Sequence, residues 1–167
     1  MKPDRYTYRL LDACTLTEAQ FAQMVEIECN CGLEPYTPEM LMTCITDMET
    51  FACFDGECVV GFLTVNCRGS YYRGSAYIVN LNVSEPYRGQ NVAKRLMYEV
   101  CRYCRGTSGI SLITLDVQKT NRAFALYQKL GFLVTAAPSR NGDTDVVMAA
   151  PLPDLEARIR RLLENEG

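Results

Sequence analysis

The sequence predicts a single α/β (α+β) domain. We expect a mixed central sheet of about six to seven strands with helices on both faces. Length and composition support one soluble domain, because 167 residues, 48% of them hydrophobic and 22% charged, can build one core. The order of local patterns supports the mixed sheet. It reads strand, two helices, three strands, helix, strand, helix, two strands, with no repeat or linker between them.

The first third contains one strand and two helices. Tyr6 to Ala13 alternates and predicts a strand. Thr17 is a suitable N-cap for the first helix, and Gly32 is expected to end it. Pro38 stands at the first position of a second helix that runs to about Asp47. Apolar residues of the first helix recur at helical spacing: Phe21, Met24, Val25 and Ile27.

The middle of the chain predicts three strands. Two β-rich runs between Thr50 and Asn66 flank Asp55-Gly56, a strong hairpin signal. After a glycine- and serine-containing turn, Ala76 to Val83 alternates as a third strand. Regular alternation would put Tyr77, Val79, Leu81 and Val83 on one face, and Ile78, Asn80 and Asn82 on the other.

The last elements alternate between helix and strand. A helix begins near Val92, because the following apolar residues have helical spacing. Ser111 to Val117 predicts a strand, Ala123 to Leu130 a helix ended by Gly131, and two strands flank Asn141-Gly142. Residues 1–152 then form the domain. Residues 153–167 hold an amphipathic helix, Asp154 to Glu164, expected to pack on the domain or on a second subunit.

Composition excludes several classes of function. The net charge of −3 argues against a general nucleic-acid binder. No apolar run is long enough to span a membrane, and the N-terminus lacks the apolar core of a signal peptide. The nine cysteines are odd in number and lie mostly in apolar runs, which favours reduced thiols in the cytoplasm. The absence of histidine removes Ser-His-Asp and Cys-His mechanisms.

A short polar loop, Arg88-Gly89-Gln90-Asn91-Val92-Ala93, joins the third strand of the middle region to the next helix. The first N–H groups of a helix have no intrahelical partner and the helix dipole adds positive charge, so this joint can bind phosphate. Arg88 and Lys94 add positive charge. A single glycine in such a turn is also common in plain connections.

The segment Thr114 to Phe132 is the second constellation. A strand ends, a polar loop carries Thr120 and Asn121, and a helix carries Tyr127 before Lys129-Leu130-Gly131-Phe132. Taken alone, this pattern also fits a helix that packs its aromatic residues in the core.

Together, the two segments resemble the GNAT superfamily of acetyl-CoA-dependent N-acetyltransferases. The loop Arg88 to Ala93 is similar to the family's pyrophosphate motif, Arg/Gln-x-x-Gly-x-Gly/Ala, and NRAFALYQKLGF to its second motif, with the family's tyrosine at Tyr127. The order of elements matches from about Tyr6 to Leu152. MVEIECNCGLEPYTPEM and Leu115-Asp116-Val117 are similar to the ribosomal-protein-alanine N-acetyltransferase branch.

The chain departs from the family pattern at defined positions. Asn91 replaces the second glycine of the loop, and asparagine tolerates left-handed backbone angles. Either Thr120 or Asn121 could take the role of the family's asparagine. Asp116 replaces a glutamate, and the branch's tyrosine pair is missing from TAAPSRNGDTDVV.

The resemblance implies acetyl-CoA as cofactor and direct acetyl transfer to an amine. Tyr127 would donate a proton to the leaving thiolate, and backbone groups of Leu81, Asn82 and Val83 would hold the pantetheine arm and the carbonyl oxygen. The general base is left between Asp116, whose pKa would rise on a buried strand, and Glu28. For Glu28, a solvated helix position is the interpretation that we favour.

The implied cofactor contacts form one set: Leu81, Asn82, Val83, Arg88, Gly89, Gln90, Asn91, Val92, Ala93, Lys94, Thr120, Asn121 and Tyr127.

Three points stay open on sequence alone. The acceptor is a peptide N-terminus, a lysine or a small amine, with the segments Cys31 to Pro38 and Arg68 to Ser75 as expected specificity elements. A non-catalytic acyl-CoA-binding module is one rival, and a metal or redox protein using Cys29-x-Cys31 or Cys101-x-x-Cys104 is another. We expect no metal site. The chain would be a monomer or a homodimer.

Overall fold

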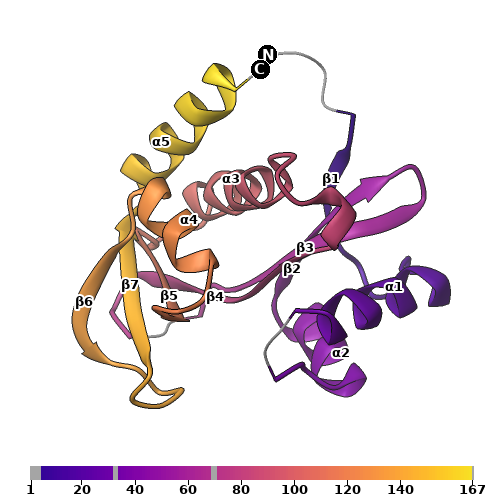
Figure 1. Cartoon of the computed structure of the whole chain (residues 1–167), viewed down its shortest axis with the longest axis horizontal. Coiled ribbons are helices and arrows are strands. Elements are labelled where there is room, and N and C mark those ends of the chain that lie inside the picture. Colours follow the sequence, from indigo (N-terminus) through magenta and orange to yellow (C-terminus); the bar gives the residue numbers. More distant parts are fainter. Residues whose placement is uncertain (1–4, 32–33, 69–70, 167) are drawn as a thin grey trace.

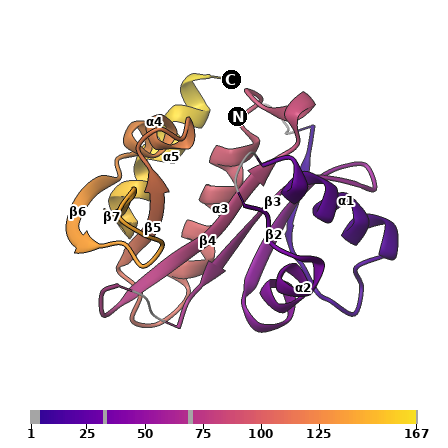
Figure 2. The same ribbon diagram turned by 60° about the horizontal axis from the view of Figure 1, so that its bottom comes forward.

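The computed structural model describes residues 5–31, 34–68 and 71–166. Within these ranges, seven strands form one mixed sheet in the order β1-β2-β3-β4-β5-β7-β6, in which only β4 and β5 are parallel neighbours (Figures 1 and 2). The strands are β1 (Thr7–Leu10), β2 (Glu49–Asp55), β3 (Cys58–Asn66), β4 (Ser75–Val83), β5 (Leu112–Gln118), β6 (Leu133–Pro138) and β7 (Asp145–Pro151). The predicted mixed α/β sheet is confirmed.

The helices lie on both faces of this sheet, as predicted (Figure 1). They are α1 (Glu18–Cys29), α2 (Pro38–Asp47), α3 (Val92–Arg105), α4 (Ala123–Leu130) and α5 (Leu152–Asn165), with a 3-10 turn at Glu85–Tyr87. Thr17 and Thr37 cap α1 and α2 by accepting a hydrogen bond from the backbone two or three residues into each helix. Gly32, the predicted end of the first helix, lies outside the described residues.

One apolar core lies under α1 and α2, and a larger one lies under α3, α4 and α5. In the first, Met24, Ile27 and Leu41 pack on Phe54 and Phe62 of the sheet. In the second, α5 contributes the buried residues Leu155, Ile159 and Leu163 and packs against α3. The apolar stripe of the C-terminal helix is therefore covered by its own chain.

The strands β4 and β5 separate part-way along their length. Their parallel pairing runs from Ser75↔Leu112 to Ile78↔Leu115 and stops there, although both strands continue. Figure 2 shows the two ribbons diverging beyond this point. The sheet therefore opens along the second half of β4, and the backbone of that half pairs only with β3.

A β-bulge in β4 changes which side chains share a face, so the predicted face assignment is wrong. Val65 pairs with Ile78 and Thr64 with Asn80, which leaves Val79 as the extra residue. Because one residue is inserted, the alternation reverses after it. Tyr77 and Asn80 therefore lie on the same face with Asn82, on the side of α1. The residues that pack into the larger core are Ala76, Ile78, Leu81 and Val83.

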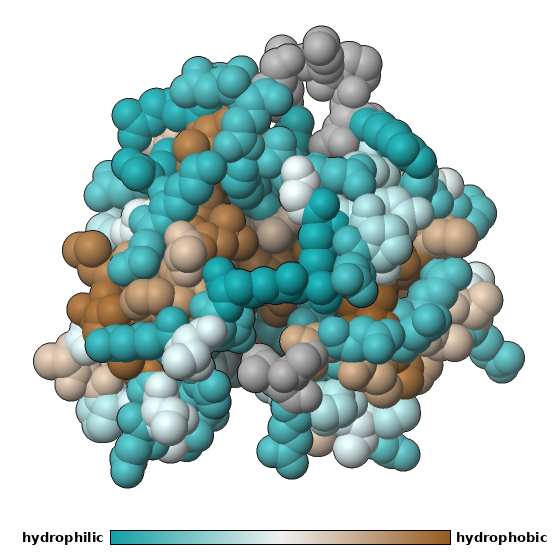
Figure 3. All heavy atoms as spheres, viewed as in Figure 1, coloured by the Kyte–Doolittle hydropathy of each residue, from teal (hydrophilic) through white to brown (hydrophobic). Residues whose placement is uncertain are grey.

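The remaining differences lie at chain bends and ends. The first strand is shorter than Tyr6 to Ala13, because Asp12 turns the chain: its side chain accepts from the Cys14 N–H and its carbonyl from Thr15. Most of the face in Figure 3 is hydrophilic, with apolar surface at the edge formed by β6, where Leu133 and Val134 are exposed. In the described ranges, none of the helices has the length and apolar character to cross a membrane.

Candidate functional site

The loop between β4 and α3 has the backbone of an anion-binding turn. Gly89 has φ +73° and Asn91 has φ +66°, and Asn91 is the one described non-glycine residue in the left-handed region. A side chain at position 89 would be strained there, whereas asparagine tolerates this conformation. Asn91 therefore replaces the expected glycine without changing the turn, and α3 begins directly after it at Val92.

Contacts to the end of β4, to the 3-10 turn and to the residue before β1 fix this loop. The Gln90 side chain donates to the Pro86 carbonyl at 2.8 Å and accepts from the hydroxyl of Tyr6, which precedes β1. The Arg88 Nε donates to the Val83 carbonyl at 2.9 Å. The side chains of Arg88 and Gln90 thus hold the loop against the sheet. The N-terminal N–H groups of α3, from Val92 onward, are the groups of this region that can receive an anion.

The end of β4 directs backbone groups into the opening beside β5. Ser84 donates its N–H to the Val60 carbonyl of β3, so Asn82 also faces β3 and the alternating residues Leu81 and Val83 face the other way. Leu81 and Val83 are two of the three positions that the resemblance assigns to the pantetheine arm. The third, Asn82, is not available for this, because its backbone groups point to β3. An extended ligand can add to this strand edge by backbone hydrogen bonds.

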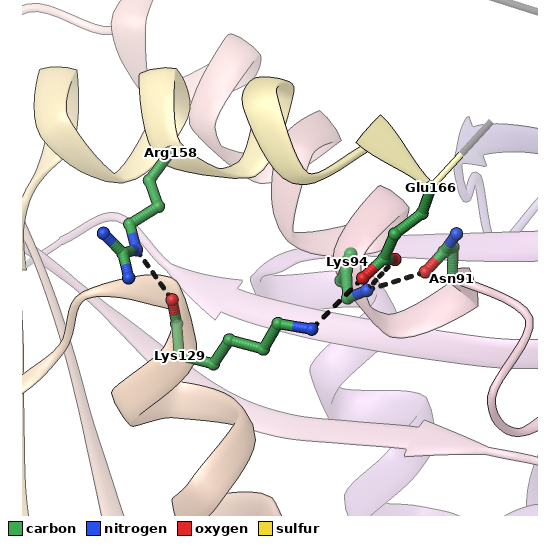
Figure 4. A network of polar contacts seen from close by, with 5 residues as sticks. All are labelled: Asn91, Lys94, Lys129, Arg158 and Glu166. Atoms are coloured by element: carbon green, nitrogen blue, oxygen red, sulfur yellow. Dashed lines mark hydrogen bonds and ion pairs between the residues drawn. The ribbon is translucent and has the colours of Figure 1, made fainter. Parts of the chain in front are cut away.

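The C-terminal end of α5 reaches the start of α3. The Lys94 ammonium donates to Asn91 Oδ1 at 2.8 Å and forms an ion pair with the Glu166 carboxylate. Lys129, in the last turn of α4, pairs with the other oxygen of Glu166 at 3.1 Å (Figure 4). Arg158 Nε donates to the Lys129 carbonyl at 2.7 Å. One carboxylate therefore bridges α3 and α4 beside the loop.

These contacts also favour the charged form of the Glu166 carboxyl. Hydrogen bonds from Lys94, then from Lys129, lower the pKa of the Glu166 carboxyl below its ordinary value. Lys94 is nearly covered, with a side chain only 12% exposed. Before any cofactor binds, Lys94 thus already holds an anion from the same chain.

Tyr127 lies on the face of the sheet that carries α3. It is 7% exposed and lies in the same core as Val92 and Val117. Its ring packs edge-on against the ring of Phe132, and the two ring centroids are 5.7 Å apart. Burial raises the pKa of Tyr127 to about 12. Its phenol therefore stays protonated at neutral pH and can donate a proton or a hydrogen bond.

Thr120 and Asn121 differ in their surroundings. Asn121 Oδ1 accepts from the Ala123 N–H at 2.9 Å at the start of α4, and its own N–H bonds to Gln118. Thr120 is exposed. Of the two candidates for the family's asparagine, Asn121 is the one that shapes the entry into the helix of Tyr127.

Asp116 lies on the opposite face of the sheet, because its neighbours Leu115 and Val117 pack into the larger core. It is half-buried and accepts hydrogen bonds from two phenols. The Tyr71 hydroxyl donates to its oxygens at 2.7 and 2.9 Å, and the Tyr77 hydroxyl donates at 2.8 Å. Burial, then the contact with Asp116, raises the pKa of Tyr77 well above its ordinary range.

Glu28 is buried, so the interpretation as a solvated helix residue is wrong. It is 4% exposed near the end of α1, where it accepts from the Tyr36 N–H at 3.0 Å and from the Asn82 amide of β4. Burial raises the pKa of Glu28 above its ordinary 4.5, and the Tyr36 N–H partly offsets this. A carboxylate with a raised pKa at the edge of an open strand is suited to accept a proton.

The two carboxylates share one face of β4. Glu28 contacts it at Asn82, and Asp116 contacts it at Tyr77. The bulge at Val79 lies between these contacts and brings both side chains of β4 to the same side. Asn80, also on this side, has an amide nitrogen that is buried without a hydrogen-bond partner in the described part of the chain.

Sequence reasoning missed Tyr71, Tyr77 and Glu166 as members of this region. Tyr71 falls in the expected specificity turn, Arg68 to Ser75, of which residues 69–70 lie outside the described ranges. Tyr77 was assigned to the wrong face, because a bulge leaves no clear signal in an alternating pattern. The position of Glu166 depends on how α5 packs, and its sequence gives no sign of this.

The two cysteine pairs lie in different surroundings. Cys101 and Cys104 are fully buried in the α3 core, as their helical spacing indicates, and Cys29 is exposed. In the described part of the chain there is no group of three or more histidine, cysteine or acidic residues that could hold a metal ion.

Comparison with solved structures supports the same architecture. The chain is similar to a ribosomal-protein-alanine N-acetyltransferase from Escherichia coli (TM-score 0.68, 19% identity, 88% of this chain and 94% of that one). It is also similar to Ard1 from Thermoplasma volcanium (0.73, 21%, 89% and 98%). A third is the PaiA N-acetyltransferase from Thermoplasma acidophilum, solved with coenzyme A (0.72, 18%, 87% and 98%). At these identities the likeness concerns the fold.

Sequence comparison gives the family. No curated protein matches the chain. The model of the acetyltransferase (GNAT) family matches residues 21–132, a span that includes Glu28, the loop before α3 and Tyr127. The chain therefore belongs to the acetyltransferase (GNAT) family and is an acetyl-CoA-dependent N-acetyltransferase.

Proposed function

We propose that this enzyme transfers the acetyl group of acetyl-CoA directly to a primary amine, with Tyr127 as the acid and Glu28 as the base. One observation carries the proposal. Tyr127 and the start of α3 lie on one face of the β4–β5 opening, and Glu28 and Asp116 lie on the other. A cofactor and an acceptor could thus approach the same strand edge from opposite sides.

The residues fit acetyl-CoA by their chemistry. The N–H groups at the start of α3 suit the pyrophosphate, with Gly89 and Asn91 shaping the turn. The outward backbone groups of Leu81 and the N–H of Val83 suit the pantetheine arm, since the Val83 carbonyl already accepts from Arg88. When bound, the cofactor supplies a thioester with a good leaving group. The carbonyl oxygen would receive its hydrogen bonds from the same stretch of β4.

The transfer needs one proton acceptor and one donor. The amine nitrogen attacks the acetyl carbon, the new C–N bond forms, the C–S bond breaks and the sulfur leaves as a thiolate. Glu28 takes one proton from the ammonium form of the acceptor, which frees the nitrogen lone pair for attack. The second proton, on the nitrogen after attack, passes to solvent, and Tyr127 donates a hydrogen bond to the departing sulfur. An ordinary thiol has a pKa of about 8.5, so the thiolate is a weaker base than the Tyr127 phenolate. Tyr127 therefore acts chiefly by a hydrogen bond to the developing negative charge.

Asp116 is the second carboxylate of the acceptor side. Its two phenol partners fix its position, and its charge suits a cationic or polar amine. Glu28 carries the base role in this proposal, because burial raises its pKa. Asp116 then orients the amine.

A panel of acceptors tests the proposed reaction. CoA release is measured with a peptide that has a free N-terminal alanine, an N-terminally blocked lysine peptide, and 1,4-diaminobutane. Mass spectrometry checks that the product gains one acetyl group on nitrogen. We expect at least one amine to be acetylated at a rate that saturates with its concentration. If none is, or if acetyl transfer goes only to water, the proposed function is wrong.

Acetyl-CoA should stabilise the fold. At a hundred times its dissociation constant it contributes about 2.7 kcal/mol, a rise in melting temperature of roughly 5–10 °C for a chain of this size. A thermal shift assay with millimolar acetyl-CoA, CoA and AMP measures this. CoA should act like acetyl-CoA, because the loop and β4 bind the parts that they share, and AMP should have little effect. Equal shifts with AMP would contradict a pyrophosphate–pantetheine site.

The variant Glu166→Gln should bind acetyl-CoA more tightly, by about threefold to fivefold at low salt. The carboxylate that pairs with Lys94 and Lys129 competes with a phosphate for the same positive charges. Because the carboxylate is partly exposed, we expect the competition to be worth about 1 kcal/mol. Calorimetric titration measures the dissociation constant, and the gain should shrink as salt is added.

The matched control is Glu164→Gln, which removes the same charge from an exposed position of α5. It should leave the affinity near that of the wild type. If both variants gain equally, net charge alone accounts for the effect. A loss of affinity in Glu166→Gln would instead mean that Glu166 helps to position Lys94.

A further inference from the structure

Tyr71 joins three segments that are distant in the sequence. It lies in the connection between β3 and β4. Its hydroxyl donates to both oxygens of Asp116 on β5 and accepts from the backbone N–H of Arg140, in the connection between β6 and β7, at 2.8 Å. One hydroxyl thus uses its donor and one of its acceptor positions, and each bond reaches a different element.

Ring contacts reinforce these bonds. The Arg140 guanidinium lies over the Tyr71 ring, 4.6 Å from its centroid, and the rings of Tyr71 and Tyr77 are 6.0 Å apart. Tyr77 also donates to Asp116. Burial raises the pKa of Tyr71, the Arg140 N–H partly offsets this, and Asp116 adds to the rise. The hydroxyl therefore stays protonated and keeps its direction as a donor to the carboxylate.

We propose that Tyr71 is a positioning residue of the acceptor site, which sets the Asp116 carboxylate and ties the connection between β6 and β7 over it. This inference rests on the proposed function, because it assigns the face of Asp116 to the acceptor amine. Tyr71 does not touch the reacting atoms. It fixes the carboxylate and the entrance through which the amine reaches it.

The position of the cluster supports this role. β4 and β5 stop pairing at Ile78↔Leu115, and Tyr77 and Asp116 are the neighbours of these residues. The Tyr71 cluster therefore stands where the sheet opens. Because Tyr71 holds both the Asp116 carboxylate and the connection between β6 and β7 at this point, it controls the width and direction of the entrance for the amine. Tyr71 and Tyr77 both donate to this carboxylate, one from the connection before β4 and one from β4 itself.

The test variant is Tyr71→Phe, which keeps the ring and removes only the hydroxyl. We expect kcat/KM for the best amine of the panel to fall about tenfold, the effect of losing a hydrogen bond to a charged group. The loss should lie mainly in the KM of the amine, while the dissociation constant of acetyl-CoA changes less than about twofold. The control is Tyr103→Phe on α3, whose hydroxyl contacts Glu49 and which lies outside both expected specificity segments, and it should match the wild type.

A double-variant cycle separates positioning from packing. If Tyr71 acts through Asp116, then Tyr71→Phe should cause no further loss of kcat/KM in an Asp116→Asn background. Losses that multiply would overturn the proposal. So would an unchanged kcat/KM in the single variant.

Hydrogen exchange of the Arg140 amide provides a readout that does not need catalysis. It should quicken severalfold in Tyr71→Phe and stay unchanged in Tyr103→Phe, because only the first loses the acceptor of that N–H. Unchanged exchange would overturn the proposed tie between the segments even if the enzyme is active. If the wild type acetylates no amine while exchange responds as expected, the proposed function fails and the tie remains as a structural feature.

Discussion

Replacing Tyr127 with phenylalanine is expected to lower kcat by roughly a hundredfold while the dissociation constant of acetyl-CoA stays within about twofold of the wild type. Phenylalanine fills the same buried space beside Phe132, so packing is preserved. What disappears is the donor to the departing sulfur, and a hydrogen bond to a charged group is worth about 1.5–3 kcal/mol. Single-turnover kinetics with saturating acetyl-CoA measures the loss in the chemical step.

The control for this variant is Tyr103→Phe. Tyr103 lies near the C-terminal end of α3, where its hydroxyl contacts Glu49, away from the loop at the N-terminal end of the helix. Its loss should leave kcat unchanged. If Tyr127→Phe also retains wild-type turnover, Tyr127 is a core residue and has no part in the transfer.

The pH dependence carries a second signature of Tyr127. Its pKa is raised to about 12, so the phenol keeps its proton up to that range. Loss of activity between pH 8 and about 10 would therefore come from another group. A decline there that disappears in Tyr127→Phe would contradict the burial of this hydroxyl.

The second large effect is expected for Glu28→Gln, with kcat/KM for the amine lower by roughly a hundredfold at neutral pH. The amide can still accept from the Tyr36 N–H but cannot take a proton. Because a base must be deprotonated and burial raises the pKa of Glu28 above 4.5, wild-type activity should rise with pH through that raised value and then level off.

The pH profile of the variant separates loss of a base from loss of structure. Without Glu28, only the amine that is already neutral reacts, so the rate of Glu28→Gln should keep rising toward the pKa of the amine. The control is Glu26→Gln, at an exposed position two residues before Glu28 on α1. It should keep the wild-type profile. A wild-type profile in Glu28→Gln would move the base role to Asp116.

Most of the fold follows from local patterns in the sequence. The threonine caps before α1 and α2 and the glycine after α4 specify helix ends, and Asp55-Gly56 specifies a hairpin. These signals are local, because each depends on backbone geometry within a few residues. The loop Arg88 to Ala93 was predictable for the same reason, including the left-handed Asn91.

The face of β4 that we propose for the acceptor could not be predicted, because it depends on contacts between distant segments. A single inserted residue at Val79 decided that Tyr77 shares a face with Asn80, and regular alternation could not reveal it. Glu28 was interpreted as solvated because its helix position alone gives no sign that β4 covers it. Asp116 and Tyr127 were candidates from the sequence because the strand and helix that carry them resemble a family pattern.

The sequence by itself determined the element order and the turn before α3, and it marked Tyr127 and Asp116 as candidates for the site. Only the tertiary structure decided that Glu28 is buried against Asn82, that Tyr71 joins Asp116 to Arg140, and that Glu166 reaches Lys94. Turns and caps are set by short-range sterics and hydrogen bonds, which the sequence displays. Burial and pairing across 45 to 72 residues depend on how the sheet opens and how the helices dock on it.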